Sequence, residues 1–175
     1  MKRLASFVLV LLLSGCAGYA PRTSGVLTIS NQRTGETSTV QYRLPNGAID
    51  PAGAWQLSYL MRDVRAAEGM AMDPRLFDFL DAICGELGLP AGAPVVITSG
   101  YRSRMTNDSL RQASRQVADN SYHMRGQAID IKIPGVPGDR VAAVAKRLRR
   151  GGVAYYPSSG HVHIDVGPVR SWSAY

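Results

Sequence analysis

Cysteine, histidine and glutamate are scarce in this chain of 175 residues. It has two cysteines, Cys16 and Cys84, and so cannot form the framework of several disulfides that stabilises many small secreted domains. Histidine and glutamate occur three times each. The longest apolar run, Leu4–Leu13, has ten residues, whereas a membrane-spanning helix needs roughly 20. These shortages exclude a disulfide-rich scaffold and a membrane-spanning helix.

The rest of the composition is that of a globular protein with one core. Hydrophobic residues make up 45% of the chain and charged residues 19%, which excludes a disordered chain. Basic side chains outnumber acidic ones by 20 to 13, for a formal net charge of +7. A positive balance of this size indicates an anionic partner, which could be nucleic acid, a membrane surface or an anionic polymer.

The N-terminal segment has the features of an export signal. Lys2 and Arg3 precede the apolar run, and Leu13-Ser-Gly-Cys16 resembles the bacterial lipobox. The alternative is an ordinary cleaved signal peptide with an incidental cysteine. Export leaves nucleic acid out of reach. We therefore predict a signal peptide over residues 1–15, a lipid on Cys16, a tether over 16–25 and one domain over 26–175.

Apolar periodicity predicts an α+β fold with a small, mostly antiparallel sheet and flanking helices. In the second predicted helix the apolar spacing buries one face, which makes Cys84 a buried, inert thiol rather than a nucleophile. The predicted strands are Leu27–Ser30, Thr39–Leu44, Pro94–Thr98, Ala128–Ile133 and His161–Val166, and the predicted helices cover 53–68, 74–88, 103–117 and 139–150.

Two of these strands bury one face and present possible metal ligands on the other. In Ala128–Ile133 every second residue from 129 is isoleucine, so Asp130 points to the opposite face. In the later strand, His161, His163 and Asp165 alternate with apolar residues in the same way. We expect the polar faces of both strands to line one site.

The spacing around these strands is typical of a catalytic zinc site. In Ser121-x-His-x-x-Gly-x-Ala-x-Asp130, a nitrogen ligand precedes the strand, an oxygen ligand lies within it, and Gly126 permits the bend between them. The later strand, which carries His161-x-His163, can supply the remaining metal ligand. Two imidazoles and one carboxylate suit zinc and leave a fourth position open for water. The alternative is a polar cleft of hydrogen-bonded histidine and aspartate with no metal.

Five ordered motifs occur along the chain, namely Ser99-Gly-Tyr-Arg-Ser103, Ser121-x-His-x-x-Gly-x-Ala-x-Asp130, Gly151-Gly-Val-Ala-Tyr-Tyr156, His161-Val-His-Ile-Asp165 and Val169-Arg-Ser-Trp172. Taken together, they resemble those of the YcbK/MepK type of murein endopeptidase. This type belongs to the zinc peptidases that include D-alanyl-D-alanine carboxypeptidases and the penicillin-insensitive murein endopeptidase. The resemblance implies a periplasmic α+β enzyme with a zinc cleft on one sheet face that hydrolyses peptide cross-links of peptidoglycan.

The resemblance also implies roles for individual residues. His123, Asp130 and His163 would bind one zinc ion per chain, and His161 would face the attacking water. Some carboxypeptidase relatives carry a catalytic glutamate three residues before the last histidine ligand, but Gly160 stands there in this chain. His161 is therefore the candidate base, since an imidazole with a pKa of about 6.5 suits that proton transfer. The alternative for His161 is to orient the substrate or stabilise the transition state.

Arg102 and Ser121 are the candidate substrate-binding residues. The forked guanidinium of Arg102 could bind a substrate carboxylate or steady a developing oxyanion, which would make it a catalytic group as well. Alternatively, Arg102 is a surface residue packed on Tyr101. Ser121 could hydrogen-bond either the substrate or Asp130, and Asp165 could orient a metal ligand.

The expected function is zinc-dependent hydrolysis of peptidoglycan cross-links, and the resemblance to the MepK type favours the L,D (3-3) bond. Two alternatives are a D,D-carboxypeptidase and an inactive lipoprotein that binds peptidoglycan, while the open ligand set disfavours a structural zinc domain. We expect a periplasmic monomer whose only contact with the membrane is its lipid. Ala17, in place of aspartate after Cys16, implies sorting to the outer membrane.

Overall fold

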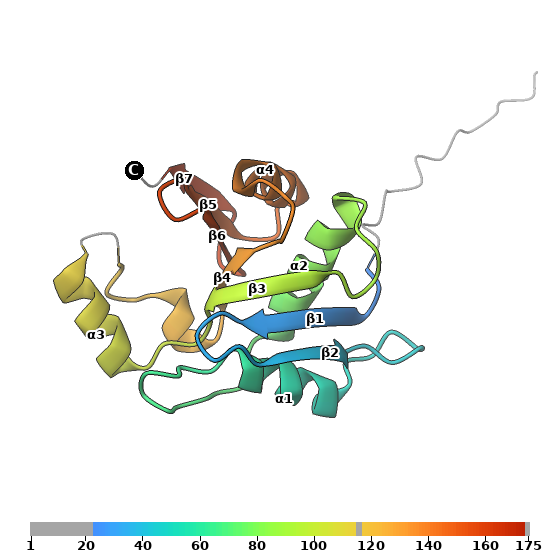
Figure 1. The fold of residues 1–175 in the computed structure, drawn as a ribbon, viewed down its shortest axis with the longest axis horizontal. Helices are drawn as coiled ribbons and strands as arrows, with labels where there is room; N and C mark the ends of the chain where they lie inside the picture. The colour runs from blue at the N-terminus through green and yellow to red at the C-terminus, as the bar shows by residue number, and fades with distance from the viewer. Residues whose placement is uncertain (1–22, 115–116, 174–175) are drawn as a thin grey trace, which may run out of the picture.

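The computed structural model describes residues 23–114 and 117–173 (Figure 1). The expected signal peptide, Cys16 and most of the expected tether lie outside these residues. Strands and helices follow one another along the described part and build one sheet with helices around it, which confirms the expected α+β class.

Seven strands in the described part of the chain form a mixed sheet. They are β1 (Val26–Asn31), β2 (Thr37–Gln41), β3 (Pro94–Ser99), β4 (Ala128–Lys132), β5 (Gly152–Tyr156), β6 (His161–Asp165) and β7 (Arg170–Ser173). Their order across the sheet is β2-β1-β3-β4-β6-β5-β7. The β1–β3 and β5–β7 pairs are parallel, and the other four pairs are antiparallel. The sheet is thus mixed, with two parallel pairs that the sequence does not predict.

The helices are α1 (Pro51–Leu60), α2 (Pro74–Glu86), α3 (Arg104–Ala113), α4 (Gly138–Leu148) and a short 3-10 helix, η1 (Tyr122–Arg125). Helices α1 and α2 begin in the same way. The side chains of Asp50 and Asp73 accept backbone N–H groups of the first turn, and a proline follows each aspartate. Proline is favourable there because the first helical N–H has no partner within the helix.

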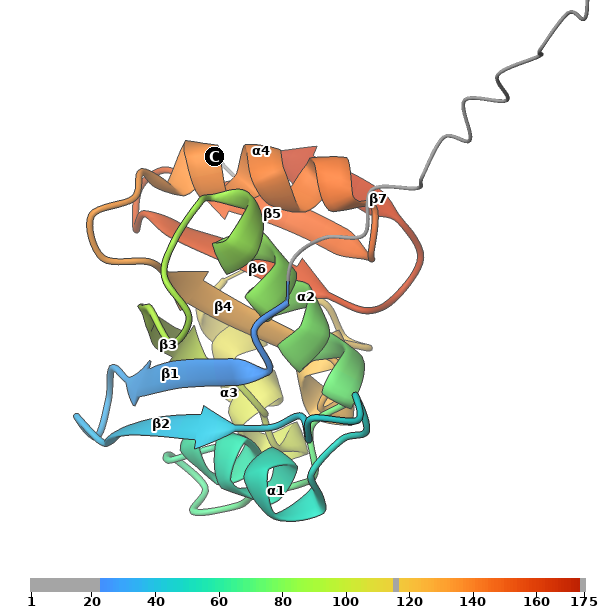
Figure 2. The same cartoon turned by 90° about the vertical axis from the view of Figure 1, so that its right-hand side faces the viewer.

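Helices α1, α2 and α4 enclose the hydrophobic core against one face of the sheet. Alternate apolar side chains of the central strands pack there against apolar residues of these three helices. Helix α3 supplies no residue of this core, and its buried side chains are the polar Thr106 and Asn107. In Figure 2, α2 and α4 lie in front of the sheet and α3 lies behind it. The polar face of the central strands is therefore left for a site.

Cys84 lies on α2 in this core and is 6% exposed. Burial raises the pKa of its thiol to about 12, so the thiolate is not populated near neutral pH. The expectation of a buried, inert cysteine is confirmed. In the described ranges, no helix combines the length and apolarity needed to cross a bilayer.

Helix α1 ends at Leu60, eight residues before the predicted end of its apolar pattern. The buried carboxylate of Asp63 accepts the backbone N–H groups of Arg65 and Ser103, which holds residues after the helix in a turn. The chain of Gly100 also approaches closely, because an added Cβ there would overlap the Met61 carbonyl. These tertiary contacts override the helical periodicity.

The strand register brings the polar side chains of the sheet into rows. Asp130 on β4 pairs with His163 on β6 and also with Ser99 on β3. Ile129 and Ile131 flank Asp130 and point into the core, which confirms the predicted alternation. The register therefore places Asp130 and His163 side by side on the face opposite the core.

Candidate active site

A cleft of about 370 Å³ opens on the polar face of β4 and β6. Its walls come from the end of β3, the segment between α3 and η1, and strands β5 to β7. All the residues that the sequence singled out for metal, substrate or proton transfer line this cleft, namely Arg102, Ser121, His123, Asp130, His161 and His163.

Three buried side chains converge at the base of this cleft. One donor atom each from His123, Asp130 and His163 lie within 4.8 Å of one another. His163 Nδ1 lies 2.9 Å from Asp130 Oδ1 and 3.2 Å from His123 Nε2. The third side of the triangle, from His123 Nε2 to Asp130 Oδ1, measures 3.4 Å. The remaining histidine, His161, lines the cleft outside this cluster.

Local structure turns His123 toward the strands. The hydroxyl of Ser121 caps η1 and accepts the backbone N–H of His123 at 3.3 Å. Gly126 ends η1 with a φ of 65°, and a Cβ there would lie 2.9 Å from the Ala71 carbonyl oxygen. Only glycine takes this conformation and this close contact without strain. The predicted bend between His123 and Asp130 is confirmed.

Hydrogen bonds on the far sides of the two imidazoles fix their tautomers. The carbonyl oxygen of Gly100 lies 2.8 Å from His123 Nδ1 and can only accept, so Nδ1 carries the proton. The carboxylate of Asp165 lies 3.0 Å from His163 Nε2 and likewise requires a proton on that nitrogen. His123 Nε2 therefore faces Asp130 with a lone pair, and His163 Nδ1 can offer one to a metal ion when it carries no proton.

Asp165 is itself held in place by four donors. Its oxygens accept the backbone N–H groups of Gly152 and Gly167 and a forked ion pair from Arg170, at 2.7 and 3.0 Å. Burial alone would raise the pKa of Asp165, but the hydrogen bonds from His163, Arg170 and Gly167 hold it far below its usual value. An ionised Asp165 keeps the His163 ring oriented.

The electrostatics of the cluster favour a negative Asp130 between the histidines. Burial would raise the pKa of Asp130, but His123, His163 and Arg102 hold it well below its usual range. Burial lowers the pKa of His123 to about 4, so this imidazole is neutral near pH 7. Burial also opposes protonation of His163, yet its hydrogen bonds to Asp130 and Asp165 raise its pKa above the usual value. A proton or a metal ion is thus stabilised at His163 Nδ1.

Arg102 is 13% exposed and contacts the site directly. Its Nη2 donates to the outer oxygen of Asp130 at 2.6 Å, and its Nε donates to the Ser99 hydroxyl at 2.8 Å. These contacts exclude the alternative in which Arg102 is a surface residue packed on Tyr101. They leave Nη1 as the donor that can reach a ligand in the cleft.

His161 stands at the rim of the cleft, two residues from His163 on the same face of β6. Its Nδ1 lies 2.7 Å from the Ser159 hydroxyl, and its ring stacks on Tyr156 with centroids 4.3 Å apart. Burial lowers the pKa of His161, and the positive groups nearby lower it as well, against an opposing effect of Asp130. A neutral, oriented imidazole at this position can accept a proton.

The sequence patterns did not single out Arg170, Ser159 or the Gly100 carbonyl as functional groups. Arg170 and Ser159 lie in motifs or turns that carried no chemical signal by themselves. A backbone carbonyl such as that of Gly100 leaves no trace in side-chain patterns at all. Ser159 and Arg170 lie close in sequence to His161 and Asp165, whereas only the tertiary fold brings the Gly100 carbonyl against His123.

Two imidazoles and one carboxylate at the base of an open cleft, with a further histidine and an arginine at its wall, form the kind of site that metal-dependent hydrolases use. Comparison with known families agrees with this class. The family model described as peptidoglycan L,D-endopeptidase MepK matches residues 17–172. The chain therefore belongs to this family of metal-dependent peptidases, and the resemblance inferred from its motifs is confirmed.

Two curated relatives support the assignment. A protein of Haemophilus influenzae (strain ATCC 51907 / DSM 11121 / KW20 / Rd), named probable peptidoglycan L,D-endopeptidase MepK, is 46% identical over 147 residues, covering 84% of this chain and 78% of the relative. The peptidoglycan L,D-endopeptidase MepK of Escherichia coli (strain K12) is 44% identical over 147 residues, covering 84% of this chain and 79% of the relative.

Proposed function

We propose that this protein is a zinc-dependent murein endopeptidase that hydrolyses L,D (3-3) peptide cross-links of peptidoglycan. The observation that carries the proposal is the convergence of three metal-ligating atoms in a chain of the MepK family. The names of the relatives support the bond specificity. The expected alternatives of a D,D-carboxypeptidase and an inactive lipoprotein become outcomes of the test below.

The donor set fits zinc. Gly100 and Asp165 each accept the proton on the far nitrogen of one ring, so His123 Nε2 and His163 Nδ1 can both turn lone pairs toward a cation beside the Asp130 oxygen. Three acceptors at such distances repel one another unless a cation lies among them. Two neutral imidazoles and one carboxylate are a common catalytic zinc set, which leaves a position for substrate or water. In our proposal these three residues hold one zinc ion per chain.

Zinc at this site would act as a Lewis acid on the scissile carbonyl and lower the pKa of water to about 7. His161 would take the proton of the attacking water at Nε2, since Nδ1 is engaged with the Ser159 hydroxyl. It would then return that proton to the leaving amine. Arg102 would use Nη1 to bind a substrate carboxylate or the developing oxyanion, and Ser121 lines the cleft as a second substrate contact.

Defined muropeptides test the proposed function most directly. Purified protein should cleave a 3-3 cross-linked dimer, lose activity with a chelator and recover it when zinc is added. Preferential cleavage of a 4-3 cross-linked dimer would show that the protein cuts the D,D (4-3) bond instead of the L,D (3-3) bond. Release of only a terminal residue would indicate a carboxypeptidase, and binding without cleavage would indicate the inactive lipoprotein.

Replacing Arg102 by alanine should lower kcat/KM by about 10²- to 10³-fold, since a charged donor to an oxyanion contributes a few kcal/mol. Lysine should recover little of this activity because it lacks the planar fork. Arg102→Ala also removes the hydrogen bond to Asp130, so we expect its zinc affinity to fall by about 10- to 100-fold. Kinetics at saturating zinc and a zinc titration separate the two effects.

The exposed Arg104 is a matched control, since it is two residues away and pairs with Asp108 on α3. Arg104→Ala should leave both zinc affinity and kcat/KM within about twofold, as expected for a surface ion pair. Full activity of Arg102→Lys would contradict a role for the guanidinium fork.

We further propose that lipid on Cys16 attaches the protein to the outer membrane. Cys16 lies in the lipobox-like sequence outside the described residues, and Ala17 follows it. Cys16→Ser should yield a soluble or unprocessed form, whereas wild-type protein should fractionate with outer membranes. Recovery of the variant in the lipidated membrane pool would rule out this anchor.

A further inference from the structure

A second groove adjoins the active-site cleft at the carboxyl ends of β1 and β3. These two strands are parallel, so the segments that follow them lie at the same edge of the sheet. Backbone of Ser99–Tyr101 forms one wall, and the turns after β1 and after α1 form the others. The groove meets the cleft where the Arg102 side chain, which lines the cleft, donates to the Ser99 hydroxyl. We refer to it as the guanidinium groove, and it is lined by Arg33, Arg62, Arg65 and the backbone of Ser99–Tyr101.

Two of its arginines, Arg33 and Arg65, have no ion-pair partner among the described residues. Arg62 pairs with Glu36 at 2.7 Å. Within residues 23–114 and 117–173, the side chains of Arg33 and Arg65 form no hydrogen bond or ion pair, and both residues are exposed. Asp63 also lines the groove, but its carboxylate is buried and accepts backbone N–H groups instead.

The two free arginines are held by similar turns. The side chain of Asn31 accepts the backbone N–H of Arg33 at 2.9 Å, and that of Asp63 accepts the backbone N–H of Arg65 at 3.1 Å. Asn31 is anchored in turn through its amide to the Leu60 carbonyl. The backbone of each arginine is thus fixed before any ligand arrives, which lowers the entropic cost of binding.

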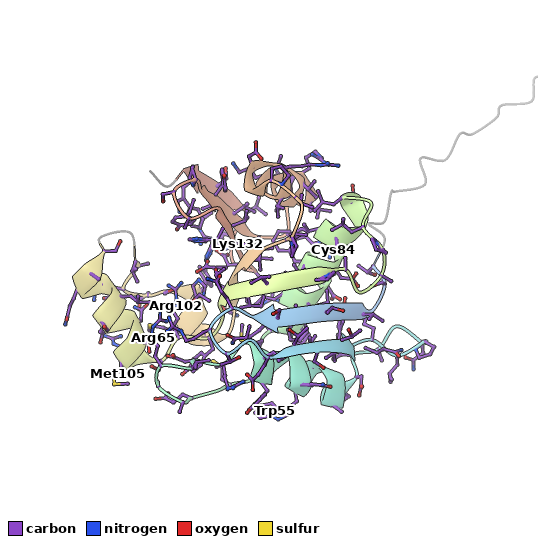
Figure 3. The ribbon with its side chains drawn as sticks, viewed as in Figure 1. Trp55, Arg65, Cys84, Arg102, Met105 and Lys132 are labelled. Atoms are coloured by element: carbon purple, nitrogen blue, oxygen red, sulfur yellow. The ribbon has the colours of Figure 1, made fainter. Side chains whose placement is uncertain are left out.

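Arg33, Arg65 and Arg102 are close enough to repel one another. Partial burial lowers the pKa of Arg65, the charge of Arg33 lowers it further and Arg102 adds a smaller effect, whereas the nearby Asp63 carboxylate raises it. Figure 3 shows Arg65 and Arg102 at the same end of the molecule. Like charges gathered beside a cleft are relieved when an anion binds between them.

We infer that Arg33 and Arg65 form a subsite for a free carboxylate of the peptidoglycan stem peptide, next to the bond that the protein cuts. This inference rests on the proposed function, because it takes the stem peptide as the substrate. A guanidinium fork matches a carboxylate with two parallel hydrogen bonds. Arg102 lines the cleft and donates to Ser99 of the groove, so in this inference a peptide held in the cleft extends its free carboxylate to the groove. The positive net charge of the chain is consistent with an acidic substrate.

The test compares one cross-linked muropeptide in two forms, with free carboxyl groups and with amidated ones. Arg33→Gln combined with Arg65→Gln should lower kcat/KM on the free form by about 10- to 100-fold, mainly through KM, as expected for lost hydrogen bonds to a charged group. On the amidated form, wild type and double variant should agree within about twofold. Zinc content should not change, since neither residue contacts the donor cluster.

Arg140→Gln is the matched control. Arg140 is an exposed residue of α4, which packs on the other face of the sheet, so this variant removes the same charge far from the groove. It should behave as wild type on both substrates. An equal loss on free and amidated peptides, no loss on either, or the same loss in Arg140→Gln would overturn the subsite.

Equilibrium binding separates this inference from the proposed function. Zinc-loaded wild type and the double variant are titrated with both peptides, and His161→Ala is used where the substrate would be consumed. If wild type cleaves neither peptide, the proposed function fails, but tighter binding of the free form that depends on Arg33 and Arg65 still supports the subsite. Cleavage without such a binding difference would refute the subsite alone.

Discussion

His163→Ala is expected to abolish both zinc binding and cleavage. Its Nδ1 is one of the three converging donor atoms, and its ring is the one that Asp165 and Arg170 hold in place. Loss of a metal that supplies several kcal/mol to the transition state corresponds to about 10³-fold or more in kcat/KM. Zinc analysis and muropeptide cleavage on the same preparation measure both effects.

Asp165→Asn is the matched variant for this prediction. An asparagine side chain can still accept from His163 Nε2, but it loses the negative charge that pairs with Arg170. We expect zinc to be retained with an affinity lowered by about 10- to 100-fold. Circular dichroism on both variants checks that they fold. Full zinc content in folded His163→Ala would show that His163 is not a ligand.

His161→Ala is expected to keep its zinc and lose turnover by about 10²- to 10⁴-fold, the usual contribution of a general acid or base. His161 lines the cleft but lies outside the cluster of donor atoms, so its removal should leave the metal in place. Its lowered pKa keeps it ready to accept a proton near pH 7. Zinc content and kcat are measured together.

Ser159→Ala serves as the control for orientation. The Ser159 hydroxyl contacts the far nitrogen of His161 and the backbone carbonyl of Tyr156, so we expect a loss of at most about tenfold from the missing hydrogen bond to His161. If His161→Ala loses its zinc, His161 is a ligand and the roles of the two histidines in β6 must be exchanged. If it keeps full activity, both proposed roles for His161 are wrong.

The alternation of β4 and β6 could be predicted from sequence because it depends on local chemistry. Each buried isoleucine or valine fixes the face of its polar neighbour, so Asp130 and His163 were assigned to one face before their register was known. The ends of α1 and the existence of β5 and β7 could not be predicted in the same way. Helix α1 is stopped by Asp63 and by the chain at Gly100, both of which are tertiary contacts.

Prediction of the site from sequence has the same limit, because sequence patterns do not record tertiary contacts. Histidine, aspartate and arginine side chains carry a chemical signal in a motif, and all six candidates line one cleft. The groups that orient them give no such signal, whether they come from a distant segment, as the Gly100 carbonyl on His123 does, or from the next turn of the chain, as Arg170 on Asp165 does. The guanidinium groove is a further case, since Arg33 follows β1 and Arg65 follows α1, and only the tertiary fold brings these two turns together.

Anomalous X-ray diffraction at the zinc absorption edge, on crystals of the zinc-loaded protein, tests the central claim most directly. Our proposal predicts one strong anomalous peak per chain, located among His123 Nε2, Asp130 Oδ1 and His163 Nδ1. The peak should disappear in His163→Ala and remain in His161→Ala. A peak on His161 in place of one of these three residues, or no peak at full zinc loading, would contradict the proposed site.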